Sequence, residues 1–238
     1  MIDLSIAMHI PDGFLSPGVA AAAGVIAVAA IAYGLRVANV DLDESRVPLL
    51  GVIAAFVFAA QMLNFPIAGG TSGHFLGATL AAVLLGPWLA CLVMAVVLIT
   101  QCLAFADGGV SALGANILNM GILGALLAGY AVKGAREVLP HTKAAFLWTV
   151  GVVSWLAVMI GAAATSLELA ISGTIPLGTV LTAMLGVHAL IGIGEAAITV
   201  AAVAAVLAAR PDLVTLAPEE LREPAPLSAP ASVEGAVG

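Results

Sequence analysis

Two histidine-containing segments carry the residue types most capable of chemistry in this chain. His9 follows Met8 near the N-terminus. His74 directly follows the Gly-rich stretch Asn64–Gly73 much further along the chain. Both segments adjoin very apolar runs. Imidazole nitrogens bind the later first-row transition metals, including cobalt, nickel, copper and zinc. The pair therefore suggests a cation site at the mouth of a membrane bundle. Otherwise His9 is a surface residue and His74 caps a short helix.

Because Met8 directly precedes His9, the two residues could together chelate one metal ion. If the chain starts at Met8, its α-amine, the His9 backbone nitrogen and the His9 imidazole close five- and six-membered rings around one metal. His74 would supply the fourth nitrogen of a planar set that Cu(II) or Ni(II) accepts. An α-amine has a pKa near 8, so it can lose its proton at neutral pH. In a chain that starts at Met1, Met8 offers only an amide nitrogen.

Several polar residues lie near the same ends of the apolar runs and could orient the two histidines, as outer-shell groups do in metal sites. The alternative is that they satisfy one another or a loop backbone. These candidates are Asp12, Gln61, Asn64, Ser72, Gln101 and Asn116, with Thr71 and Asn119 beside them.

Composition places the site in a membrane. Of 238 residues, 62% are hydrophobic and 9% are charged, with a mean hydropathy of +1.17. Soluble domains carry roughly a quarter charged residues. Much of the net charge of −7 lies in the C-terminal tail, and no basic patch favours nucleic acid. The two cysteines form no CxxC pair, so we expect them to be packing residues.

The apolar runs predict an all-α integral membrane protein with about seven transmembrane helices. The third run is well short of the roughly twenty residues needed to cross. The Gly-rich segment before it is therefore expected to dip into the membrane. Alternatively, residues 75–105 form a helical hairpin that does not fully cross. We also expect a possible break near Gly192 and Gly194. The predicted spans are Val19–Leu35, Pro48–Leu63, His74–Gly86, Pro87–Phe105, Ile117–Val132, Ala144–Ala170 and Leu177–Ala209.

Charge placement supports seven crossings. With the N-terminus outside and the C-terminus in the cytoplasm, every Lys and Arg falls on the cytoplasmic side, as the positive-inside rule requires. His9 and His74 then share the outer side. We expect residues 1–7 to be an N-terminal extension outside the mature chain. Residues 8–210 form the membrane metal-binding domain, and residues 211–238 form a disordered cytoplasmic tail.

Three stretches carry a family resemblance. They are Met8-His9-Ile10-Pro11-Asp12-Gly13-Phe14-Leu15, Gly69-Gly70-Thr71-Ser72-Gly73-His74, and the segment from Asp107-Gly108-Gly109 to Gly114-Ala115-Asn116. The chain resembles the cobalt/nickel S components of energy-coupling factor transporters, the CbiM/NikM family, from Met8 to about Arg210. The resemblance implies a seven-helix subunit of the plasma (inner) membrane that binds Co2+ or Ni2+ as transported substrate through Met8, His9 and His74.

The same resemblance implies a transmembrane coupling subunit, a pair of cytoplasmic ATPases and a small accessory membrane subunit as partners. The chain has no phosphate-binding loop, which agrees with a transport subunit that is not an enzyme. Residues 1–7 depart from the family pattern. A start at Met8 restores the motif, whereas proteolysis could also expose Met8, or the amine ligand is lost.

Two other hypotheses stay open. One is a membrane-embedded enzyme using His74, His188 or Glu195, because ionisable residues within membrane spans are functional candidates. The sequence contains no Gly-x-Ser-x-Gly or His-Glu-x-x-His motif, which counts against it. The other is a purely structural membrane subunit.

Overall fold

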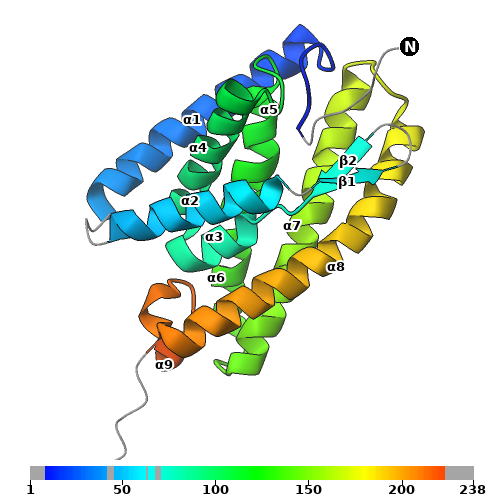
Figure 1. Cartoon of the computed structure of the whole chain (residues 1–238). Coiled ribbons are helices and arrows are strands. Elements are labelled where there is room, and N and C mark those ends of the chain that lie inside the picture. Colours follow the sequence, from blue (N-terminus) through cyan, green and yellow to red (C-terminus); the bar gives the residue numbers. More distant parts are fainter. Residues whose placement is uncertain (1–8, 42–45, 63, 68–70, 223–238) are drawn as a thin grey trace, which may run out of the picture.

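Helices dominate a computed structural model that describes residues 9–41, 46–62, 64–67 and 71–222 (Figure 1). A two-stranded antiparallel hairpin interrupts them. The elements are α1 (Pro17–Asp41), α2 (Val47–Gln61), β1 (Asn64–Ile67), β2 (Thr71–His74), α3 (Ala78–Leu85), α4 (Pro87–Phe105), α5 (Leu113–Ile117), the π-helical η2 (Leu118–Leu127), α6 (Ala128–Val138), α7 (Lys143–Ile171), α8 (Leu177–Ala209), η3 (Pro211–Leu213) and α9 (Glu219–Arg222).

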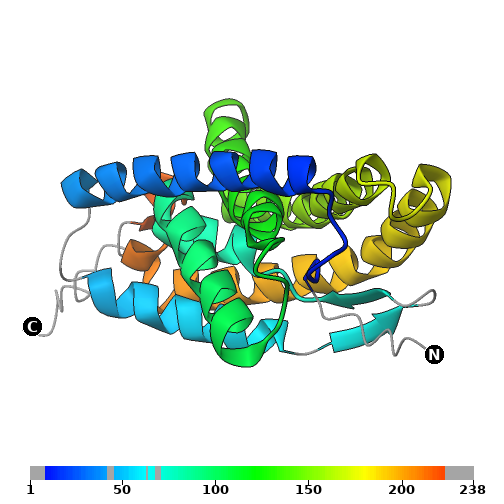
Figure 2. The same ribbon diagram turned by 90° about the horizontal axis from the view of Figure 1, so that it is seen from above.

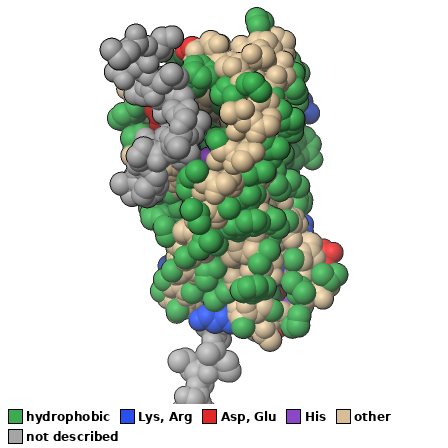
Figure 3. All heavy atoms as spheres, turned by 90° about the vertical axis from the view of Figure 1, so that its right-hand side faces the viewer, with side chains coloured by type: hydrophobic (Ala, Val, Ile, Leu, Met, Phe, Trp, Pro, Cys, Tyr) green, Lys and Arg blue, Asp and Glu red, His purple; other side chains and the backbone are tan. Residues whose placement is uncertain are grey.

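Five helical segments are long and apolar enough to cross a membrane. They are Pro17–Asn39, Pro87–Phe105, the continuous α5–η2–α6 segment Leu113–Val138, Lys143–Ile171 and Leu177–Ala209. Hydrophobic side chains cover most of the face seen in Figure 3, where charged side chains are sparse. The chain is therefore a multi-pass membrane protein, as predicted. The helix α2 has 15 residues and α3 has 8, so both are shorter than a full span.

The short helix α3 lies at the centre of the bundle. All eight of its residues are buried. It begins after Gly77, whose φ of +72° is in the left-handed region, and ends at Gly86, whose φ is +86°. A Cβ at Gly77 would also come within 3.0 Å of a Val57 methyl. Two glycines therefore allow the chain to turn into and out of this buried helix.

A hairpin replaces part of the expected third helix. The helix was predicted from His74, but residues 71–74 are extended and pair with residues 64–67, so that Asn64 faces His74. The Gly-rich segment thus forms a strand pair at one end of the bundle, beside α8 (Figures 1 and 2). The expected break near Gly192 and Gly194 is also absent, because α8 runs unbroken from Leu177 to Ala209.

The first part of the C-terminal tail is also ordered, contrary to the expectation of disorder from residue 211. The buried Val214, Leu216 and Ala217 join the hydrophobic core that contains α3. The Leu216 N–H donates to the Val83 carbonyl at 3.1 Å, and the Thr215 hydroxyl donates to the Leu84 carbonyl at 2.7 Å. Three small or apolar side chains and these hydrogen bonds are enough to attach residues 211–222 to the C-terminal end of α3.

Candidate metal site

His9 and His74 meet at one end of the bundle. Their ring centroids lie 5.2 Å apart with the planes inclined at 68°. The His9 residue is only 3% exposed. Both rings line one cavity of about 110 Å3, between the segment before α1, β2 and the helices η2, α7 and α8. In Figure 2, the segment before α1 turns back from the helix toward β2 and α8. Two segments distant in sequence therefore bring two imidazoles to one buried place.

The segment that carries His9 is held by α5 and by the loop between α4 and α5. The side chain of Asn116 bonds both backbone groups of Ile10, accepting from its N–H at 3.0 Å and donating to its carbonyl at 3.2 Å. The Gly109 N–H donates to the same carbonyl at 2.9 Å. The Asp12 carboxylate accepts from the Ser111 N–H at 2.7 Å and from its hydroxyl, and these bonds lower the pKa of Asp12. This pairing fixes the backbone on the C-terminal side of His9.

Glycines permit that close pairing. A Cβ at Gly109 would lie 2.2 Å from the Asp12 nitrogen, and one at Gly108 would lie 2.8 Å from the His9 Cβ. Gly108 also has a φ of +91°, which favours glycine. The Asp107–Gly108–Gly109 stretch singled out in the sequence therefore serves backbone contact with the His9 segment.

His74 has the geometry of a neutral ligand. Its Nδ1 lies 2.7 Å from the Phe75 carbonyl, so an Nδ1–H donates there and Nε2 keeps the lone pair. Burial lowers the pKa of His74 to about 3, with the neighbouring His9 as the next cause. The ring is therefore neutral near pH 7, as a metal-binding imidazole must be.

His9 presents two buried ring nitrogens that no described residue satisfies with a hydrogen bond. Of the two, Nδ1 lies 3.2 Å from an Asp107 carboxylate oxygen. An unsatisfied buried polar atom costs free energy unless a ligand partners it. The donor set is thus nitrogen-rich with a carboxylate close by, which suits a divalent transition metal.

His188 of α8 also lines this cavity, together with Asn119, Met120 and Met184. Its Nδ1 lies 2.8 Å from the Met184 carbonyl. The sequence offered His188 only as a candidate residue of an enzyme, and the structure places it on the wall of the same cavity. Nevertheless, no group of three or more His, Cys, Asp or Glu side chains within the described part of the chain is arranged to hold a metal.

The remaining sequence candidates divide into four groups. Asn116 lines the cavity, whereas Asp12 and Gln61 instead hold backbone next to the two histidine segments. Gln101 is fully buried, and its amide bonds no described residue. The backbones of Asn64 and Ser72 lie in the hairpin, but their side chains, like all of Met8, fall outside what the structure describes.

Two buried carboxylates complete the polar groups near the site. Glu195 accepts hydrogen bonds from two backbone N–H groups just beyond His74. Glu168 is buried and accepts from the Asn119 amide at 2.8 Å. Sequence reasoning flagged Glu195 as an intramembrane carboxylate but could not find its partners, because they are backbone groups.

The fold and the site define a class: a multi-pass membrane protein with a buried His9 and a half-buried His74 side by side at one end of its bundle. The family model described as the cobalt uptake substrate-specific transmembrane region, CbiM, matches residues 9–213. The chain belongs to this CbiM/NikM family of cobalt and nickel transport components.

Relatives agree with that membership. A relative from Haloquadratum walsbyi, named only for metal transport, is 43% identical over 209 residues, covering 87% of this chain and 93% of its own. The cobalt transport protein CbiM of Sorangium cellulosum is 33% identical over 217 residues, covering 87% and 94%. A solved structure described as a truncated transition metal transporter superposes with a TM-score of 0.75 and 32% identity, covering 85% of this chain and 99% of that one.

Proposed function

We propose that this chain is the substrate-capture membrane subunit of an ATP-driven Co2+/Ni2+ uptake transporter. The observation that carries the proposal is the meeting of His9 and His74, whose rings lie 5.2 Å apart in one cavity. Relatives named for cobalt and for nickel transport support these two ions as the substrate.

The proposed coordination uses both imidazoles and the chain around Met8. In a chain that begins at Met8, the α-amine and the His9 backbone nitrogen complete a four-nitrogen set with the two rings. His74 would bind through Nε2, since its Nδ1 is bonded to the Phe75 carbonyl. The chelate uses His9 Nδ1, so the metal would take up the ring nitrogen that now lies beside Asp107.

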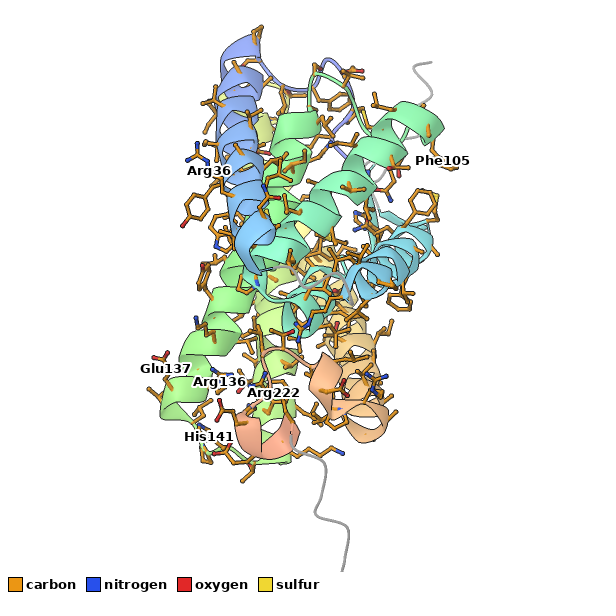
Figure 4. All side chains as sticks on the ribbon, turned by 90° about the vertical axis from the view of Figure 1, so that its left-hand side faces the viewer. Arg36, Phe105, Arg136, Glu137, His141 and Arg222 are labelled. Carbon is orange, nitrogen blue, oxygen red and sulfur yellow. The ribbon has the colours of Figure 1, made fainter. Side chains whose placement is uncertain are left out.

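The proposed orientation places this site outside and the charged end in the cytoplasm. Arg136, His141 and Arg222 lie near one another at the lower end of the bundle in Figure 4, far from Phe105. Arg136 and Arg222 at that end agree with the positive-inside rule, whereas Arg36 lies higher, at about the level of Phe105 in the same view. We propose that this lower end faces the coupling subunit and the ATPase pair, with the small accessory membrane subunit completing the plasma-membrane complex.

The test is intact-mass analysis of the protein expressed from its native start region, with metal content measured on the same sample. A mass that begins at Met8 with about one Ni or Co per chain would support the full proposal. A mass that begins at Met1 with metal bound would keep the transport role but remove the amine ligand. Protein that starts at Met8 and binds neither metal, even when loaded, would contradict the site.

A further inference from the structure

A buried carboxylate on α8 holds the turn that follows His74. Glu195 is 2% exposed, and its two carboxylate oxygens accept separate hydrogen bonds. One oxygen accepts from the Leu76 N–H at 2.7 Å and the other from the Gly77 N–H at 2.8 Å. Carboxylates within membrane helices are costly and mark functional places. This one lies far from His74 in sequence but bonds the backbone two and three residues beyond it.

The same turn is held from a second side. The Gln61 amide of α2, fully buried, donates to the Leu76 carbonyl at 2.8 Å. The N–H and the carbonyl of Leu76 are thus bonded to side chains from two different helices. Side-chain amides and carboxylates that bond buried backbone restrict it to one arrangement, because leaving those groups unpaired is costly.

A short, continuous path joins this turn to the His74 ring. The ring Nδ1 lies 2.7 Å from the Phe75 carbonyl, and that carbonyl belongs to the same peptide group as the Leu76 N–H that Glu195 accepts. The peptide therefore meets His74 on its carbonyl side and Glu195 on its N–H side. Groups that bond the non-ligating ring nitrogen fix the tautomer and direction of a metal-binding histidine.

We propose that Glu195 is a positioning residue for His74: by holding the Phe75–Leu76 peptide, it aims His74 Nε2 at the cation. The inference rests on the proposed function and deepens it. Glu195 does not line the cavity, so it acts through the peptide and not by touching the ion. It also attaches α8, which carries His188 on the cavity wall, to the backbone of the metal-binding segment.

The experiment measures Ni2+ binding alone by the purified full chain, through affinity and the Ni2+ absorption bands that report the ligand set. In Glu195→Gln, the amide keeps one acceptor and turns an N–H donor toward the second backbone N–H. We expect about ten- to a hundredfold weaker binding with shifted bands, the range typical of outer-shell partners. Glu195→Asp keeps two acceptor oxygens and should recover part of the affinity.

The matched control is Ser154→Ala, which removes another buried polar side chain at the contact of α7 with α8; it bonds Thr199 at 3.3 Å, and neither residue lines the cavity. We expect it to bind Ni2+ like the wild type. A double-mutant cycle adds His74→Ala to each protein. If Glu195 acts through His74, the effect of Glu195→Gln on Ni2+ binding should disappear in the His74→Ala background.

Three results would overturn the inference. They are wild-type affinity and bands in Glu195→Gln, an effect that persists undiminished without His74, and loss of folding in both Glu195 variants while Ser154→Ala folds. The last would make Glu195 a residue for folding only. Failure of the wild-type chain to bind Ni2+ or Co2+ would instead contradict the proposed function, so the two failures are distinguishable.

Discussion

The two ends of the bundle hold their polar residues in opposite ways. At the histidine end, His9 and Asn116 are each 3% exposed and bonded to or packed against distant segments. At the other end, His141 and Glu220 pair at 3.0 Å while their side chains remain 47% and 62% exposed. The His9 and Asn116 side chains are removed from solvent, whereas the His141 and Glu220 side chains remain exposed to it.

This difference in exposure distinguishes a candidate binding site from an ordinary solvent-exposed surface. Buried imidazoles and amides persist only where hydrogen bonds or a ligand satisfy them. Exposed ion pairs contribute little and are readily exchanged for water or for another protein. The burial of His9 and its close approach to His74 are the observations behind the proposed capture site, and the following changes test the contrast.

Removing either imidazole should have the largest effect. His74→Ala or His9→Ala takes away a proposed ligand, so we expect Ni2+ affinity to fall by more than about a hundredfold, beyond the range of outer-shell changes. Isothermal titration of each variant measures this loss. Affinity within a few-fold of wild type in both would place the ion elsewhere.

A methyl group at the close approach of the two loops should come next. In Gly109→Ala the new Cβ would meet the Asp12 nitrogen at 2.2 Å and Pro11 at 2.6 Å, so the His9 segment must shift. Overpacking of about 1–3 kcal/mol corresponds to roughly fivefold to 150-fold in affinity if it acts fully on binding. Gly18→Ala is the matched control, because nothing lies within 4 Å of its Cβ.

The Asn116 amide should have a smaller effect. Asn116→Ala leaves the Ile10 N–H without its partner, while the Ile10 carbonyl keeps the bond from Gly109. One unsatisfied buried group costs about 1–3 kcal/mol, of which we expect metal affinity to show about a fivefold to tenfold loss. Gln101→Leu, which removes an amide bonded to no described residue, should leave Ni2+ affinity unchanged. Equal losses in both variants would contradict the distinction.

A substitution at the exposed end should have the smallest effect, and that effect should be a pH-dependent change in thermal stability. The hydrogen bond to Glu220 raises the pKa of His141 above its usual range. A raised pKa stabilises the fold below the unfolded value near 6.5, and that contribution disappears as the pH rises through the folded pKa. His141→Ala should therefore lower the thermal midpoint slightly near pH 6 and not at about pH 9, with Ni2+ affinity unaffected. A change in Ni2+ affinity would contradict the separation of the two ends.

Hydropathy predicted the long helices because a bilayer demands runs of apolar residues. It could not predict the hairpin, whose strands have four residues each and include Pro66. The placement of Lys and Arg residues predicted that His9 and His74 share one side of the membrane, and the structure places their rings 5.2 Å apart. Glu195 and residues 214–217 both bond backbone groups. Every residue carries such groups, so the residue types in the sequence could not predict these contacts.

The most direct test of the central claim is X-ray absorption spectroscopy of the Ni2+-loaded full chain, which counts imidazole ligands from their multiple-scattering signature. If His9 and His74 both bind the metal, we expect two imidazoles on one Ni2+ in the wild type. We expect one imidazole in either His9→Ala or His74→Ala loaded at high Ni2+ concentration. A wild-type spectrum with no imidazole, or one unchanged by both substitutions, would contradict the central claim.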